Sequence, residues 1–147
     1  MTGGTSLRAL LERPVTLRGI RLGLPSDAVL DTESLRVVGL EVLCDDGGRR
    51  FLPLAAARLR RDQVAVGSAL VLLEEGDREF YRRRSRAFSA LVGRPVERAG
   101  RSLGLLVDLL VSPDGTVAAV AARANGSPVL HDSAGVTIAP ASKASAA

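Results

Sequence analysis

Chemically reactive side chains are scarce in this chain of 147 residues, which has one cysteine, Cys44, and one histidine, His131. A single cysteine cannot form an internal disulfide, and a single histidine cannot supply the common zinc ligand sets or a Cys/His nucleophilic pair. The chain also lacks the Gly-x-x-x-x-Gly-Lys sequence that cradles phosphate groups. We therefore expect a protein that is not an enzyme, with no cofactor and no metal site. Cys44 is expected to be a small core residue, and His131 is expected to form a surface pair with Asp132.

Long apolar runs are absent as well. No stretch approaches the roughly 18 uncharged apolar residues that a transmembrane helix needs, so no transmembrane segment is expected. The first six residues do not combine a basic region with a long apolar stretch, which argues against a secretory signal. These two absences predict a cytoplasmic protein.

Aromatic residues make up only 3% of the chain, with no tryptophan and a single tyrosine, Tyr81. Surfaces that bind nucleic acids usually add exposed aromatic rings to their basic groups. Basic groups themselves are abundant, since the net charge is +4 and Lys143 is the one lysine among 20 basic residues. An excess of arginine fits phosphate recognition, and it fits the codon use of a GC-rich genome equally well. Composition leaves both interpretations open.

The most informative feature that is present is an internal repeat. The pattern Arg-Pro-Val-x-x-x-Gly-x-x-Leu-Gly occurs at residues 13–23 and again at residues 94–104, a constant shift of 81 positions. Repetition of this kind indicates two copies of one small supersecondary unit. The first glycine of each copy suits a turn with positive φ, and the second suits a bulge or a close backbone approach. These glycines are Gly19 and Gly100, and then Gly23 and Gly104.

Alternating apolar residues between Gly, Pro and Asp turns predict a mainly β protein. The clearest strand is Leu35–Cys44, whose predicted core face consists of Val38, Leu40, Val42 and Cys44. Ser6 is expected to cap a short helical turn, and Pro25 is expected to mark a sheet edge or a bulge. Further strands are expected at 14–17, 22–30, 50–54, 95–98, 102–112, 117–123, 128–130 and 136–138, with a hairpin formed by 63–66 and 69–73.

A basic segment joins the two copies. Apolar residues at helical spacing after Asp77 predict a short amphipathic linker helix over residues 76–90. This segment carries four neighbouring arginines, Arg82, Arg83, Arg84 and Arg86. They are candidates for binding RNA, anionic lipid or an acidic protein, and the alternative is an ordinary solvated helix face.

Carboxylates in the chain have structural explanations. Asp27 and Asp108 recur after the glycine bend of each copy, so we expect them to accept hydrogen bonds from neighbouring strand amides. Aspartate is favoured in Gly-containing turns because its side chain bonds to the local backbone, and this explanation is preferred over metal binding or acid–base chemistry. The turn residues concerned are Asp45, Asp46 and Asp114.

The second copy carries a longer set of motifs than the repeat alone. They are Leu91-Val92-Gly93-Arg94-Pro95-Val96, then Gly100-Arg101-Ser102-Leu103-Gly104 with Val107-Asp108, and then a Pro-Asp-Gly turn before an Ala/Val strand. This set resembles the PRC-barrel family, and residues 10–75 look like a more divergent member. The resemblance implies small all-β barrels like those of the photosynthetic reaction-centre H subunit and the ribosome maturation factor RimM. It implies docking modules without universal catalytic residues, in which the structural motif positions are Arg13, Pro14, Gly19, Gly23 and Asp27, and Arg94, Pro95, Gly100, Gly104 and Asp108.

Together these patterns predict two PRC-barrel-like β-barrels in tandem, over residues 8–75 and 91–140, with a disordered tail at 141–147. The counterpart of the 63–73 hairpin would fall beyond Ala147, so the second barrel is expected to lack its last strand pair. Unpaired strand edges are templates for strand addition. The gap is therefore expected to be filled by the other half, by a second protomer in a homodimer, or by a partner peptide.

The expected function is that of a protein-interaction or scaffolding module that docks a protein partner along a strand edge or groove. The alternative is an RNA- or ribosome-associated factor that binds through the arginine-rich linker. Salt dependence separates the two, because phosphate contacts weaken steeply with rising salt.

Overall fold

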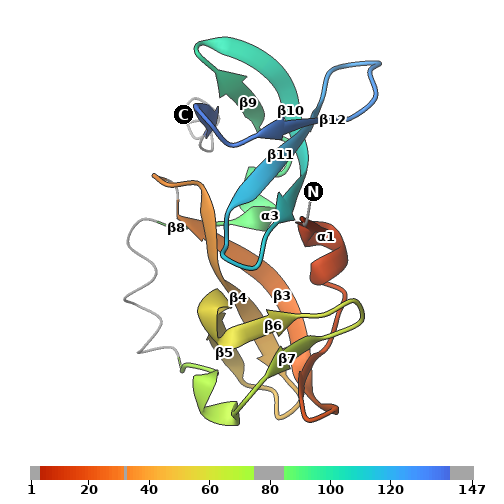
Figure 1. The fold of residues 1–147 in the computed structure, drawn as a ribbon, viewed down its shortest axis with the longest axis vertical. Coiled ribbons are helices and arrows are strands. Elements are labelled where there is room, and N and C mark those ends of the chain that lie inside the picture. Colours follow the sequence, from red (N-terminus) through yellow and green to blue (C-terminus); the bar gives the residue numbers. More distant parts are fainter. Residues whose placement is uncertain (1–3, 32, 75–84, 140–147) are drawn as a thin grey trace.

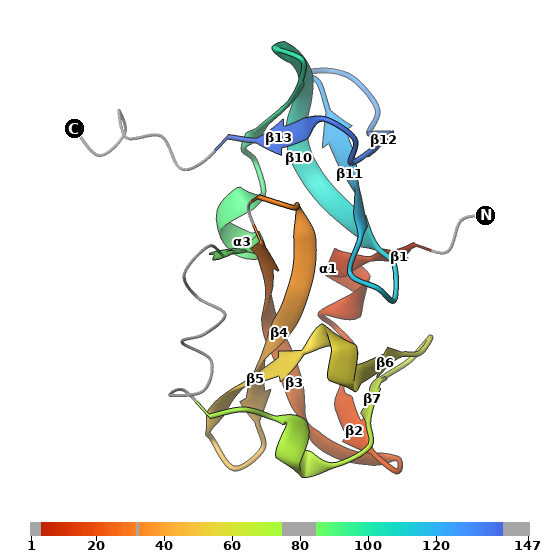
Figure 2. The ribbon, with the colours of Figure 1, turned by 60° about the vertical axis from the view of Figure 1, so that its left-hand side comes forward.

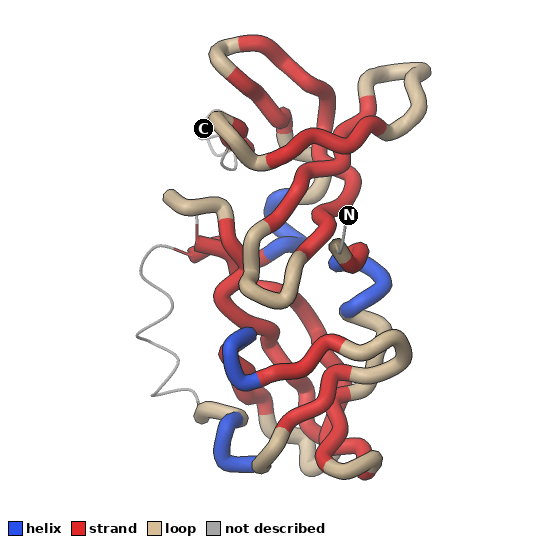
Figure 3. The backbone as a smooth tube through the Cα atoms, in the orientation of Figure 1, coloured by secondary structure: helices blue, strands red, loops and turns tan. Residues whose placement is uncertain are grey.

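The computed structural model describes residues 4–31, 33–74 and 85–139, and these residues lie mainly in β-strands (Figure 3). Two sheets, one from each half of the repeat, are arranged along the long axis of the molecule (Figure 1). The predicted mainly β class is confirmed, and one of the sheets is a curled half-barrel. Two separate closed barrels are not confirmed.

The first-half sheet is built around two long antiparallel strands, β3 (Ile20–Asp31) and β4 (Arg36–Cys44). Its strand order is β5-β4-β3-β2-β7-β6, in which β2 and β7 run parallel. The register between β3 and β4 shifts at two places, and such bulges bend a strand and increase its twist. The other elements are β2 (Val15–Leu17), β5 (Arg49–Pro53), β6 (Ala57–Leu59) and β7 (Val64–Val66), with the 3-10 helices η1 (Leu54–Ala56) and η2 (Ala69–Val71).

The second-half sheet repeats most of this order as β12-β11-β10-β9-β13. Its last strand, β13, lies beside β9 as β7 lies beside β2, but it runs antiparallel to its neighbour. Among the described residues, no strand of this sheet takes the position that β6 holds beyond β7. The strands are β9 (Pro95–Arg98), β10 (Arg101–Val111), β11 (Val117–Ala122), β12 (Val129–Asp132) and β13 (Val136–Ile138).

A very short strand and a one-turn helix precede each sheet. They are β1 (Thr5–Ser6) with α1 (Leu7–Leu10), and β8 (Ser85–Ala87) with α3 (Phe88–Leu91). Each segment crosses to the opposite half, since β1 pairs with the end of β10 and β8 pairs with the end of β3. The register is the same under the 81-residue shift, because Thr5 pairs with Val111 and Arg86 pairs with Leu30. The halves are therefore joined by a reciprocal exchange of segments, at the level of α1 and α3 in Figure 2.

The exchanged helices bury their apolar residues in a core that both halves share. Leu7 and Leu10 are fully buried, and their equivalents Phe88 and Leu91 are buried almost as deeply. Buried residues of both sheets belong to one continuous hydrophobic cluster. Contact between the predicted units 8–75 and 91–140 is therefore made by core side chains as well as by the connecting chain. The division into the units 8–75 and 91–140 stays a prediction.

Local turn chemistry confirms several expectations. Ser6 accepts a hydrogen bond from the amide of Ala9 at 3.2 Å and so caps α1. Gly19 and Gly100 have φ angles of 81° and 79°, as their turns require. The register of β3 shifts next to Pro25, which confirms a bulge there, although β3 lies inside the sheet rather than at its edge.

Other local expectations differ from the structure. The hairpin of 63–66 with 69–73 is wrong, because β7 pairs with β2 and β6, while Ser68 caps the 3-10 turn of η2. Val38 does not share the core face of β4, since the bulge beside Val29 brings Val37 into the core instead. The predicted linker helix is not confirmed. Residues 75–84 and the predicted tail lie outside the described residues, residues 85–87 form β8, and α3 begins only at Phe88.

Candidate functional site

Two aspartates fasten the exchanged helices to the opposite sheets. Asp108 on β10 accepts a hydrogen bond at Oδ1 from the amide of Arg8 (3.1 Å) and another at Oδ2 from Oγ of Ser6 (2.5 Å). Asp27 on β3 accepts from the amide (3.1 Å) and the hydroxyl of Ser89. The amide following each aspartate also donates to its Oδ1, at 2.8 Å. The predicted hydrogen-bonding role is present, but the partners include the first helical turn of the other half rather than strand amides alone.

The second glycine of each repeat permits a close approach of two strands. A Cβ at Gly23 would lie 2.5 Å from the carbonyl oxygen of Leu43, and one at Gly104 would lie 2.6 Å from that of Ala122. Separations this short are incompatible with any larger residue unless the backbone moves. The predicted close approach is confirmed at both positions.

The Arg-Pro pair of each repeat fixes the start of a strand. The carbonyl of Pro14 accepts from the amide of Val64 (2.8 Å), and the carbonyl of Pro95 accepts from that of Ala139 (2.9 Å). These bonds join β7 and the end of β13 to equivalent places. The side chain of Arg13 donates from Nη1 to the carbonyl of Arg60 (2.6 Å). For Arg94 the contact is a backbone one, in which its carbonyl accepts from the amide of Leu106 (2.8 Å).

Fewer of the described side chains fill the inner face of the second-half sheet than fill that of the first half. In the first half, residues after β5 place four apolar side chains in the core, namely Leu54, Val64, Val66 and Leu72. In the second half, Val136 is the buried apolar residue after β12 among those described. A cavity of about 260 Å³ remains, lined by Leu103, Ala121, Arg123, Gly126, Ser127, Val129 and His131.

Strand register identifies which residues of β5 and β12 correspond. In the first sheet, Asp27 is in register with Glu41, and Glu41 is in register with Phe51. In the second sheet, Asp108 is in register with Val120, and Val120 is in register with Leu130. Because the two aspartates are equivalent, Leu130 occupies the position of Phe51. By the same reasoning, the next residue along β12, His131, occupies the position of the fully buried Leu52.

The outer edges of these two strands differ. Phe51 forms two hydrogen bonds with Leu73, from the Phe51 amide (2.9 Å) and to the Phe51 carbonyl (2.7 Å). An extended segment thus covers the edge of β5, and the neighbouring Leu72 is buried in the core. Among the described residues, no strand pairs with the outer edge of β12. Leu130 is 54% exposed, whereas Phe51 is 2% exposed.

Exposed apolar side chains lie on both faces of the sheet, on the edge strand β12 and on β10, which is separated from it by β11. On the outer face, Leu130 lies in register with Val120, and Leu105 in register with Ala122. Leu105 and Leu130 are about half exposed, at 51% and 54%. On the inner face, Val129 borders the cavity and is also 54% exposed. We call these residues and the edge of β12 the β12 surface.

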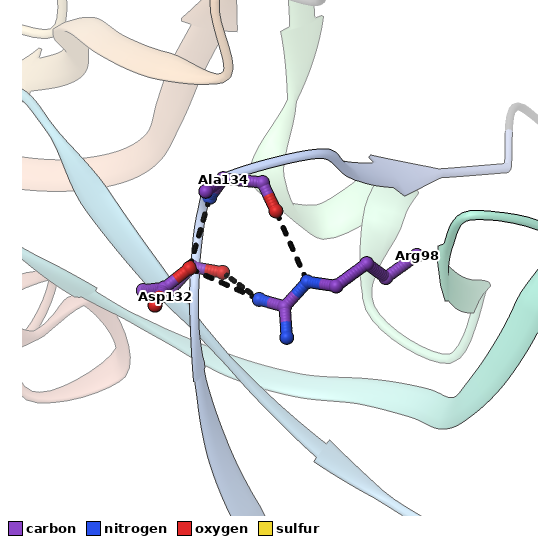
Figure 4. A network of polar contacts seen from close by, with 3 residues as sticks. All are labelled: Arg98, Asp132 and Ala134. Carbon is purple, nitrogen blue, oxygen red and sulfur yellow. Dashed lines mark hydrogen bonds and ion pairs between the residues drawn. The ribbon is translucent and has the colours of Figure 1, made fainter.

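His131 and Asp132 do not form the predicted surface pair. Nε2 of His131 is enclosed, has no hydrogen-bond partner among the described residues and belongs to a side chain that lines the cavity. Asp132 binds Arg98 instead, as Figure 4 shows: Nη2 of Arg98 donates to the Asp132 carbonyl (2.6 Å) and to its Oδ1 (3.0 Å). Nε of Arg98 donates to the carbonyl of Ala134 (3.0 Å), so β12 is anchored to β9 at this end.

One sequence pattern is associated with catalysis in other proteins. Residues 100–104 read Gly-Arg-Ser-Leu-Gly, which fits the Gly-x-Ser-x-Gly pattern of nucleophile elbows. That motif requires a strand, a sharp turn and a helix, whereas Ser102 lies in β10 after a hairpin turn. Its Oγ accepts from the amide of Gly104 (3.3 Å). The local fold therefore gives Ser102 a turn-stabilising contact and not the setting of a nucleophile.

Asp46 and Asp114 bond to their own turns as their sequence context predicts, whereas the carboxylate of Asp45 accepts from Nε of Arg21 (3.2 Å). Asp46 accepts from the amide of Gly48 (2.8 Å), which is the main reason that the pKa of Asp46 is held below its usual range. Thr116 donates its hydroxyl (2.7 Å) and its amide (3.0 Å) to Asp114, and these bonds lower the pKa of Asp114. Cys44 is buried as expected, and desolvation raises the pKa of its thiol.

The predicted arginine cluster is described only in part. Arg82, Arg83 and Arg84 lie outside the described residues, and Arg86 is exposed on β8. In the described part of the chain, no group of three or more potential metal ligands comes together. The helices in that part are all too short to cross a lipid bilayer.

Comparison of the sequence with protein-family models and with curated proteins gives no match. The resemblance to PRC-barrels therefore stays a prediction that depends on the motif residues. Within the molecule itself, the first half serves as the best comparison for the second half, because the repeat makes their strands equivalent.

Proposed function

We propose that this protein is a non-enzymatic interaction module, built from two PRC-barrel-like halves, that binds an extended apolar segment of a partner protein along the β12 surface. The observation that carries this proposal is the outer edge of β12, with which no strand of the described residues pairs, whereas its counterpart in the first half is paired with Leu73. Extended peptides commonly bind by adding a strand to such an edge.

The segment that covers β5 in the first half indicates which kind of residues a partner of β12 needs. Its residues Leu72 and Leu73 form an extended apolar segment in which one residue is hydrogen-bonded to the edge and the other is buried in the core. A partner with alternating apolar residues would make the same contacts on β12. One side chain would enter the cavity beside Val129 and His131, and the next would lie against Leu130 on the outer face.

The charges around β12 favour an acidic residue in the partner. Arg123 lines the cavity and donates to the carbonyl of Ser102 (2.6 Å), with no ion pair to a described carboxylate. Asp132, the acidic group at the other end of β12, is already paired with Arg98 at 3.0 Å. An acidic residue beside the apolar positions of the partner would therefore be favoured. Main-chain hydrogen bonds would supply affinity, and the alternating side chains would supply selectivity.

A displayed library of random peptides, selected against the purified full chain, tests this function. We expect enrichment of peptides with alternating apolar residues and an acidic neighbour. The strongest peptide should then bind Leu130→Pro at least tenfold more weakly, because proline removes the outward amide donor and truncates the side chain. Leu70→Ser is the matched control, since Leu70 is an 89% exposed leucine of the first half.

Each outcome bears on the proposal. Enrichment of no peptide, or equal binding by wild type and Leu130→Pro, would contradict it. Self-association of the chain that Leu130→Pro abolishes would assign the β12 surface to a second copy instead. Circular dichroism of the variant is the control for folding.

RNA or ribosome binding remains the alternative function. It depends on Arg82, Arg83, Arg84 and Arg86, and only Arg86 is among the described residues. No observation on the described part of this cluster favours it over the docking of a protein segment.

A further inference from the structure

A second cavity, unrelated to the β12 surface, lies in the first half and is bordered by arginines. It has a volume of about 380 Å³ and is lined by Arg18, Gly19, Arg58, Arg60, Gln63, Ala65, Val66 and Gly67. The three arginines come from three segments: the turn between β2 and β3, strand β6, and the loop between β6 and β7. A cavity of this size is in the range that holds a small molecule.

The positions of these arginines are set by the backbone. Arg58 lies in register with Ala65, and Ala65 lies in register with Thr16, so the arginine extends from the same face as two smaller side chains. The amide of Arg60 donates to the carbonyl of Gln63 (2.9 Å). The carbonyl of Arg60 accepts from Nη1 of Arg13 (2.6 Å). Arg18 is held in a tight turn with φ of 51°.

No described carboxylate forms an ion pair with any of the three guanidinium groups. Ion pairs between described residues involve Arg21, Arg50 and Arg98, and none of them involves an arginine of this cavity. Three like charges around one cavity repel each other, and an anion between them would relieve the repulsion. The planar guanidinium group is suited to bind phosphate oxygens through two parallel hydrogen bonds.

From this arrangement, we propose that Arg18, Arg58 and Arg60 bind a small molecule that carries two linked phosphate groups. A phosphate monoester carries about −1.5 to −2 at neutral pH, so two linked phosphates roughly balance three guanidinium groups. Gly19 and Gly67 have no side chain, and a Cβ at either position would meet no atom within 4 Å, which leaves room for the ligand. None of the described residues that line the cavity is aromatic, so these residues offer no ring for stacking with the bases of single-stranded RNA.

The test is a titration of the full chain with pyrophosphate in a phosphate-free, low-salt buffer, in which isothermal calorimetry measures the heat of binding. We expect saturable binding to wild type and a loss of affinity of about tenfold or more in Arg58→Gln and in Arg60→Gln. Arg18→Asn should weaken binding similarly, and asparagine tolerates the positive φ at that position. Arg101→Gln, an exposed arginine of the second half, is the matched control and should bind like wild type.

Absence of pyrophosphate binding to wild type would overturn the proposal, as would unchanged affinity in all three cavity variants. A short RNA of equal phosphate concentration is the competitor. If it binds more tightly than pyrophosphate and loses affinity in the same variants, the cavity is a contact for a nucleic-acid backbone and not for a small diphosphate. Thermal unfolding of each variant verifies that the fold is retained.

Discussion

At the scale of single residues, Asp27 and Asp108 have the same role in the two halves of the molecule. Each carboxylate accepts one amide hydrogen bond from a helix of the other half, at 3.1 Å in both cases. Each also accepts from its own following amide. A carboxylate that accepts hydrogen bonds from its own strand and from a helix of the other half couples the two halves directly. This explains why aspartate recurs after both glycine bends.

Replacement of Asp108 measures that coupling. Asp108→Ala leaves the amides of Arg8 and Leu109 without this acceptor, so we expect a loss of about 2 kcal/mol in the free energy of unfolding. Asp108→Asn keeps one acceptor oxygen and should lose less. Urea unfolding followed by circular dichroism checks this. A stability of Asp108→Ala equal to that of wild type would show that the contact does not hold α1 in place.

The turn at Asp114 gives a pH-dependent prediction. Its folded pKa is lowered by the hydroxyl and the amide of Thr116, so Asp114 contributes stability above its unfolded pKa. That contribution is lost as the pH falls through the lower, folded pKa. Thr116→Val removes the hydroxyl donor and should raise the pKa of Asp114. Carboxyl chemical shifts recorded across the acid range check this, with Asp46 as the internal reference that should not move.

At the scale of elements, the hairpin turns depend on left-handed backbone. Gly100 has φ of 79°, and a Cβ there would meet no atom within 4 Å, so substitution tests backbone strain alone. Gly100→Ala should destabilise the protein by about 1 kcal/mol. Gly67 has equally open surroundings but no positive φ, so Gly67→Ala should be neutral or slightly stabilising. Equal effects of the two substitutions on the thermal midpoint would contradict this explanation.

Elements whose signals are local could be predicted from the sequence. The Ser6 cap, the turn at Gly19 and most of the strands follow from the identity of a few adjacent residues. The exchange of β1 and β8 could not be predicted in this way, because a two-residue strand such as Thr5–Ser6 carries no pattern and its partner lies about 100 residues away. The predicted 63–73 hairpin is wrong because β7 pairs with the distant, parallel strand β2, and Leu73 pairs with Phe51.

In the candidate sites too, features with a signal in the sequence could be predicted, and features that depend on the pairing of distant strands could not. The repeat points to a difference in strand pairing between the two halves, and no strand of the described residues pairs with the outer edge of β12. The arginine cavity was not predicted, because Arg18, Arg58 and Arg60 are brought together only when β2, β6 and β7 pair. His131 was placed at the surface, while strand register gives it the position of the core residue Leu52.

At the scale of the whole molecule, two repeats form one body through exchanged segments. Leu7 and Leu10 complete the core beside β10, while Phe88 and Leu91 complete it beside β3. Removal of either helix would expose apolar residues of the opposite half. The shared core holds the second-half sheet in place, and no strand of the described residues covers the outer edge of β12.

Native-state hydrogen exchange of the full chain tests this interlocked architecture most directly. Amides at the centre of β4 in the first half and of β11 in the second half report the opening free energy of each sheet. The account predicts that these two groups exchange with the same free energy, and that Asp108→Ala lowers both by the same amount. Two distinct free energies, of which Asp108→Ala lowers only that of the second half, would show two independent domains and contradict it.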